Sequence, residues 1–142
     1  MSFLDAEDAL IERYQQRVRA RIYSTDELAQ IEEKAQVVPS VHVIYDGWAP
    51  TQALDQGAVQ EIEHRWLAVV CVRSSSQRNQ AAGKRQKASE IIDEVIQASI
   101  GWRPGQGYKP LRFADSPKPA YSDAGFAYFP LAFATRTQHR AC

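Results

Sequence analysis

The stretch from Gly125 to Gln138, GFAYFPLAFATRTQ, alternates as a strand does but carries apolar groups on both faces. One face of this strand holds Ala127, Phe129, Leu131 and Phe133. The other face holds Phe126, Tyr128, Pro130, Ala132 and Ala134. Pro130 has no backbone N–H to donate, which places this strand at a sheet edge or at a bulge. Because an exposed apolar edge promotes aggregation, we expect a neighbouring subunit or the segment 46–60 to cover the face of Phe126 and Tyr128.

Two longer helices are predicted, over residues 3–22 and 80–100. In the first, Leu4, Ile11, Tyr14, Val18 and Ile22 recur at helical spacing. The second has an apolar stripe of the same kind and ends at Gly101, with Pro104 preventing continuation. A short polar helix is predicted from Asp26 to Ala35, where Ser24 and Glu27 match a capping box.

Three further segments read as strands. The run RWLAVVCVR at 65–73 has seven apolar residues between arginines, which indicates a central strand covered on both faces. A strand begins at Val41 and meets the turn signal Asp46–Gly47, and residues 111–114 form a short strand. The segment 46–60 is either a loop or an extended hairpin arm. Its Trp48 either marks a contact surface or folds back onto the core.

The element order predicts an α+β fold in a single domain over residues 1–142. We expect a mostly antiparallel sheet with the two longer helices packed on one face. The core spans about residues 3–136, and residues 137–142 form a flexible C-terminal tail.

Charge is balanced overall but unevenly spread along the chain. The 17 basic and 17 acidic residues cancel, yet residues 1–72 hold 12 acids and 6 bases, whereas residues 73–142 hold 5 acids and 11 bases. The halves therefore carry about −6 and +6. Either these are solvated faces, or surfaces of opposite sign meet within the fold or between copies packed head to tail.

A cluster of five basic residues lies between positions 73 and 87: Arg73, Arg78, Lys84, Arg85 and Lys87. No aromatic residues interleave with it to stack bases, and the pI is about 6.8, below that of a usual nucleic-acid-binding domain. A protein contact or a solvated surface is therefore favoured over nucleic acid.

The sequence carries no motif for catalysis, cofactor binding or metal binding. His42, His64 and His139 lack the spacing of metal ligands, and no nucleophile elbow is present. The glycines of GQGYKP are followed by Pro110, where a dinucleotide fingerprint needs its third glycine. No apolar run approaches the ~18 residues of a membrane span, and the acidic N-terminus does not match a signal peptide. We expect a protein of the cytosol that acts by assembly or binding and is not an enzyme.

Four segments together resemble the tail terminator proteins of Mu-like phages and prophages, which are related in fold to the lambda tail terminator. They are VHVIYDGW (41–48), RWLAVVCVR (65–73), AAGKRQKASEIIDEVIQASIGWRP (81–104) and AGFAYFPLAFAT (124–135). The resemblance covers about residues 37–136. Its most specific motifs are the helix exit Gly101–Trp102 and the aromatic strand Tyr128–Leu131.

This resemblance implies a small α+β domain that forms a homohexameric ring. The ring caps the head-proximal end of the tail tube, stops tube polymerisation and presents the docking surface for the head connector. The implied partners are other copies of the chain, the tail tube protein, the head–tail connector or neck protein and, in a contractile tail, the sheath protein. DNA is met only as it passes through the ring lumen, and no cofactor, metal or membrane takes part.

The implied location is the neck region of the virion tail, with assembly in the host cytoplasm. A different neck or head-completion protein and a small nucleic-acid-binding α+β module are the alternatives. For the interface with other subunits or the tube we select Trp48, Arg73, Arg78, Lys84, Arg85, Lys87, Phe126 and Tyr128. The basic members face acids of a neighbour, such as Asp5, Asp8, Glu32 or Glu33, in this hypothesis.

Overall fold

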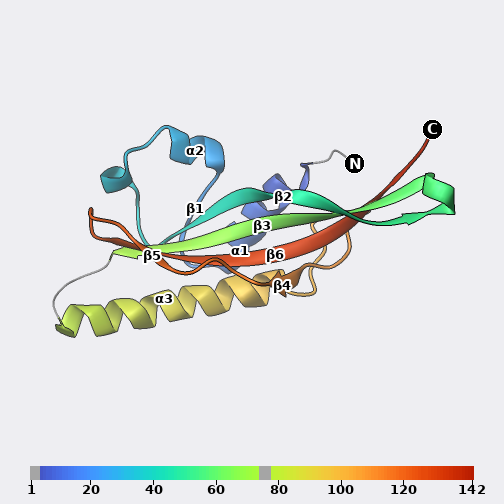
Figure 1. Cartoon of the computed structure of the whole chain (residues 1–142). Helices are drawn as coiled ribbons and strands as arrows, with labels where there is room; N and C mark the ends of the chain where they lie inside the picture. Colours follow the sequence, from blue (N-terminus) through green and yellow to red (C-terminus); the bar gives the residue numbers. More distant parts are fainter. Residues whose placement is uncertain (1–3, 74–77) are drawn as a thin grey trace.

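The computed structural model describes residues 4–73 and 78–142, with side chains from residue 87 onward in the second range. It is a single α+β domain, as predicted (Figure 1). Its elements are α1 (Ala6–Arg17), β1 (Arg21–Tyr23), α2 (Thr25–Ala29), the 3-10 turn η1 (Glu33–Ala35), β2 (Ser40–Leu54), the 3-10 turn η2 (Asp55–Gly57), β3 (Val59–Arg73), α3 (Arg78–Ser99), β4 (Arg112–Ala114), β5 (Ala120–Tyr121) and β6 (Phe126–Arg140).

The described strands form one mostly antiparallel sheet in the order β1-β2-β3-β6-β4, with β5 also paired to β6. Long antiparallel ladders join β2, β3 and β6, while β1 runs parallel to β2. The prediction that residues 65–73 form a central strand is confirmed, because β3 has a partner along each edge. Its side chains from Ala68 to Val72 are buried on both faces.

Both longer helices pack on the same face of the sheet, as predicted (Figure 1). The core on that face joins Leu10 and Tyr14 of α1 to Ile91 and Val95 of α3, over Val70 of β3. The Tyr14 hydroxyl lies 2.8 Å from Ser99 Oγ, so the two helices share a buried hydrogen bond as well as apolar contact.

The ends of the helices depart from the sequence expectation. Helix α1 stops at Arg17, and Val18 is already extended, so the predicted helix 3–22 is too long. Residues 21–23 instead pair with residues 40–42 as a parallel strand. The predicted helix 26–35 is divided between α2 and η1, although its capping box forms: Ser24 Oγ accepts from Glu27 N at 3.2 Å, and Glu27 Oε1 accepts from Ser24 N at 3.2 Å.

Strand β6 is longer and less peripheral than predicted. It continues to Arg140, where it pairs with Val59, so residues 137–140 belong to the sheet and the expected flexible tail is wrong for them. Backbone N–H groups of Phe126 and Ala132 point to the β4–β5 side, where they donate to Ser122 Oγ and Ser116 Oγ. Pro130 is an even number of residues from both, so its nitrogen faces the same side of β6. It lies in the gap between β5 and β4, where no strand needs a hydrogen bond from it.

The segment 46–60 is an extended hairpin arm rather than a loop. Strands β2 and β3 pair out to Leu54 and Val59, with register shifts after Tyr45 and after Pro50. The turn η2 places Asp55 and Gln56 at φ values of 50° and 56°, which closes the hairpin tightly. The arm extends past the helices, together with the end of β6 (Figure 1).

The helix–sheet contact makes a direct prediction about stability. Ile91 is fully buried between α3 and the sheet, so Ile91→Ala leaves a cavity and lowers the free energy of unfolding by about 2–5 kcal/mol. Ile100 is 50% exposed at the end of α3, so Ile100→Ala changes stability by less than about 0.5 kcal/mol. Urea unfolding followed by circular dichroism compares them, and equal losses in both variants contradict the assigned core.

Candidate assembly surfaces

The hairpin arm presents the longest continuous exposed stretch in the described chain. Every residue from 48 to 58 is exposed, and the Trp48 side chain is 58% exposed, so Trp48 does not fold back onto the core. A two-stranded ribbon alone is only marginally stable in water. Here β6 adds a third strand as far as Val59, which holds the base of the arm while its tip stays accessible.

A network of charged side chains fixes the base of the arm. Glu61 accepts hydrogen bonds from Lys109 Nζ at 2.9 Å, from Arg136 Nη1 at 3.2 Å and from Thr51 Oγ1 at 2.9 Å. The bond from Lys109 is the main reason why the pKa of Glu61 lies below its usual value. The network therefore ties β2, β3, β6 and the segment before β4 together.

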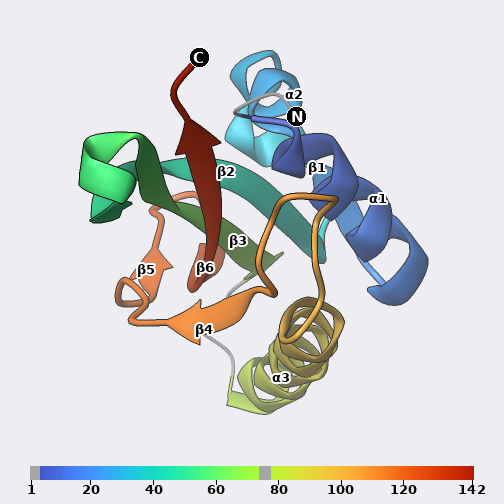
Figure 2. The same cartoon turned by 90° about the vertical axis from the view of Figure 1, so that its right-hand side faces the viewer.

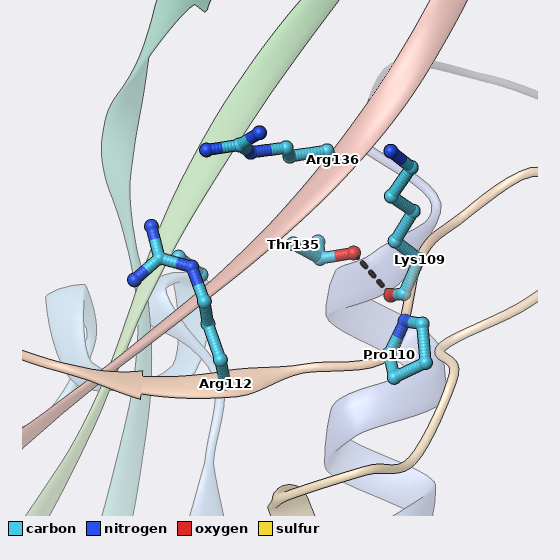
Figure 3. A pocket seen from close by; sticks show the side chains of 6 residues that line it. Lys109, Pro110, Arg112, Thr135 and Arg136 are labelled. Atoms are coloured by element: carbon cyan, nitrogen blue, oxygen red, sulfur yellow. Dashed lines mark hydrogen bonds between the residues drawn. The ribbon is translucent and has the colours of Figure 1, made fainter.

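Next to this network, three cations surround a shallow hollow of about 330 Å³ (Figure 3). Lys109, Arg112 and Arg136 line it, and the side chains of Lys109 and Arg112 are 56% and 55% exposed. Arg112 and Arg136 also pair with Glu63, whose carboxylate is in part shielded from solvent. Two acids and three bases leave this surface with an excess of positive charge, a feature that sequence reasoning missed because its members come from distant segments.

The basic cluster selected from sequence is only partly described. Arg73 and Lys87 are exposed, and the Arg73 guanidinium lies 4.9 Å from the centre of the Phe126 ring. Arg78, Lys84 and Arg85 fall in the first half of α3, and their side chains lie outside the described residues. The role of this cluster in an interface stays a prediction.

Phe126 and Tyr128 do not form the exposed interface that the sequence suggested. Phe126 is fully buried, and Tyr128 is half-buried. The Tyr128 hydroxyl donates to the Glu33 carboxylate and accepts from Gln36 Nε2 at 3.2 Å. The cover of Tyr128 thus comes from residues 33–36 of the same chain, and neither a neighbour nor the segment 46–60 is needed.

The same segment closes a buried polar cluster on the sheet, which we call the His42 latch. His42 Nε2 lies 3.0 Å from Gln36 Oε1 and 3.2 Å from Ser40 Oγ. Burial lowers the pKa of His42 to about 4 and raises that of the neighbouring Cys71 thiol to about 11. Both groups are therefore neutral near pH 7, as a buried site requires.

The described residues contain no group of three His, Cys, Asp or Glu side chains arranged to hold a metal ion. Within the same ranges, no helix has both the length and the apolar character to cross a membrane. The described chain exposes the hairpin arm and the cationic hollow.

The sequence matches the family of phage tail terminator proteins over residues 1–141. The chain is a member of the phage tail terminator family. It is thus a structural phage protein whose place is the virion, in agreement with the resemblance seen in the sequence.

A solved structure of similar fold comes from the virion of a native gene transfer agent particle. The two chains share 13% sequence identity with a TM-score of 0.56, over 97% of this chain and 100% of that chain. At this identity the likeness concerns the fold alone. No curated protein sequence matches this chain.

The His42 latch makes stability depend on pH. Because the folded pKa of about 4 lies below the ordinary value of 6.5, the unfolded chain takes up a proton first as pH falls. Stability from this group is complete above about pH 6.5 and is lost toward pH 4. The wild type should lose about 1–2 kcal/mol more unfolding free energy between pH 7 and pH 5 than His42→Gln, whose amide does not titrate in this range.

Urea unfolding at the two pH values measures this difference, and both proteins retain His64, whose pKa is also lowered by burial. An NMR titration of the His42 ring in the wild type provides an independent check. Identical pH profiles for the two proteins, or a ring that titrates near pH 6.5, contradict the assignment.

Proposed function

We propose that this protein closes the tail of a phage or phage-like particle as a homohexameric ring. The ring caps the head-proximal end of the tail tube, stops further polymerisation and offers its opposite face to the head connector. The family match over residues 1–141 carries this proposal. The similar fold of a chain in a gene transfer agent virion supports a role within a particle.

The mechanism is steric and depends on surface shape rather than on chemistry. A cap must bind the last tube ring through one face and refuse a further tube ring on the other. In the described chain the two ends differ strongly, because the hairpin arm extends beyond the helices at one end only (Figure 1). In a ring whose axis runs along the strands, the arms would project from one face alone, so that only that face would carry them.

We assign the arm to contact with the tube or the connector, across the neck region of the tail. An exposed tryptophan near the base of a projecting hairpin is a typical interface anchor. In a contractile tail the sheath protein is a further neighbour, and DNA passes through the lumen of the ring. The arm and the lumen need no cofactor for these roles.

Termination is tested by adding the protein to tail tube subunits as they polymerise. We expect shorter tubes whose length falls as the protein increases, with the protein at one end in electron micrographs. Six copies of 16.0 kDa give a ring of about 96 kDa in light scattering. Unchanged tube lengths and ends rule out termination and favour another neck or head-completion role. DNA binding with a steep salt dependence favours a nucleic-acid-binding module.

The arm is tested by Trp48→Ala. The side chain is mostly exposed, so the free energy of unfolding changes by less than about 0.5 kcal/mol, whereas capping needs roughly tenfold more protein. Ile100→Ala removes a similarly exposed apolar side chain from the end of α3 and serves as the control. Equal capping by both variants excludes Trp48 as an anchor.

A further inference from the structure

Strand β2 carries two bulges along the hairpin arm, and Trp48 lies between them. The first bulge is formed by residues 46–47 opposite the single residue Arg65 of β3, and the second by residues 51–52 opposite Glu61. A bulge bends the strand that carries it and redirects the neighbouring side chains. The direction in which Trp48 projects therefore depends on how firmly these two bulges are held.

The outer part of the arm is little supported by packing against the body of the protein. Residues 51–58 are all exposed, and the turn η2 lies well away from α1 and α3 when the molecule is seen from the end that carries the arm (Figure 2). Beyond the second bulge, two ladder pairs join β2 to β3 in the described chain. A ribbon of this kind is marginally stable alone, so contacts at the bulges must set its direction.

The charged residue opposite each bulge supplies such a contact. Arg65 Nε donates to Asp46 Oδ2 at 2.7 Å, across the first bulge. At the second, the Thr51 hydroxyl lies 2.9 Å from Glu61 Oε1 and 3.2 Å from the Glu61 carbonyl oxygen. Each bulge is thus fixed to β3 by a side-chain bond at the point where the regular ladder is interrupted.

The same two residues also reach the segment on the far side of β6. Arg65 and Glu61 are four positions apart in β3, so their side chains lie on the same face of the sheet. Arg65 donates to the backbone carbonyl of Asp115, and Glu61 accepts from Lys109 Nζ at 2.9 Å. Each bulge is therefore joined, through one β3 side chain, to the segment 109–115 that flanks β6.

We propose that Arg65 and Glu61 are positioning residues, which hold the two bulges of β2 and so aim Trp48 at the partner of the arm. This inference rests on the proposed function, in which the arm contacts the tube or the connector. A group that is already fixed in its binding direction loses less conformational entropy on contact, so affinity rises without a new contact. Arg65 and Glu61 act through the bulges, whereas Trp48 makes the contact.

The test releases each bulge and leaves Arg65 and Glu61 in place. Asp46→Ala removes the partner of Arg65, and Thr51→Val removes the hydroxyl that bonds to Glu61. Both positions are exposed, so the melting temperature should change by less than about 3 °C. Each variant should need roughly threefold more protein to cap tail tubes, and the double variant roughly tenfold, because the arm must be ordered on contact. Tube lengths in electron micrographs over a dilution series give these values.

The same two substitutions in a Trp48→Ala background separate aiming from a general loosening of the sheet. If the bulges act by directing Trp48, releasing them adds little once that side chain is gone. The triple variant should then cap within about twofold of Trp48→Ala alone. Independent effects multiply instead to a loss of roughly a hundredfold relative to the wild type, and that outcome overturns the proposal.

Thr25→Val is the matched control. This exposed hydroxyl also donates to β2, at 3.2 Å from the carbonyl oxygen of Val43, but near the end of the strand away from the arm. Capping by Thr25→Val should equal that of the wild type. Hydrogen exchange of the backbone amides in residues 48–58 gives a readout without tubes: it should be faster in Asp46→Ala and Thr51→Val and unchanged in Thr25→Val. Unchanged exchange in the two bulge variants contradicts the positioning role.

The outcomes keep the positioning role apart from termination itself. Bulge variants that cap as well as the wild type overturn the positioning and leave the proposed function standing. So does a Trp48→Ala variant with full capping, because no anchor is then left to aim. A wild type that does not cap tubes overturns the proposed function and the positioning together.

Discussion

The burial of β3 on both faces and along both edges is the constraint on which the rest of the structure depends. Its central residues, from Ala68 to Val72, leave no polar side for water. Strands β2 and β6 must therefore pair along its edges, α3 must cover one face, and other groups must shield the opposite face. The segment 33–36 shields part of that opposite face, because it lies over Tyr128 and Gln36 bonds to His42. A short polar segment thus has a structural role that its composition does not suggest.

Features that depend on a few neighbouring residues were predicted from the sequence. Features that depend on hydrogen bonds between distant strands were not. The capping box at Ser24 and the helix exit at Gly101 each arise within a few residues, as does the apolar run of β3. Residues 21–23 continue a helical periodicity through Ile22, yet they pair as a strand because residues 40–42 offer a parallel partner. Residues 137–140 have no apolar alternation, and pairing with the extended β3 holds them in the sheet.

The candidate surfaces show the same division. The sequence left undecided whether the Trp48 side chain is buried or exposed, because a strand pattern does not reveal how far a hairpin projects. Tyr128 was assigned to an interface because alternation shows that a face is apolar without showing what covers it. Its partners, Glu33 and Gln36, lie more than 90 positions earlier in the chain, beyond any local motif. The cationic hollow likewise joins Lys109 and Arg136 from different segments of the chain, although they are closer in sequence.

A sheet with two unlike edges also explains why a chain of zero net charge is suited to the proposed ring. Two identical edges favour a symmetric dimer, which ends growth after one contact. Unlike edges favour head-to-tail contact, and a fixed rotation between copies then closes the ring. Opposite charges of the two halves meet within the fold, where Lys109 and Arg136 pair with Glu61, and their overall cancellation keeps a closed ring free of strong repulsion. In the proposed ring, the arm projects past the helices and is therefore placed to meet the tube or the connector.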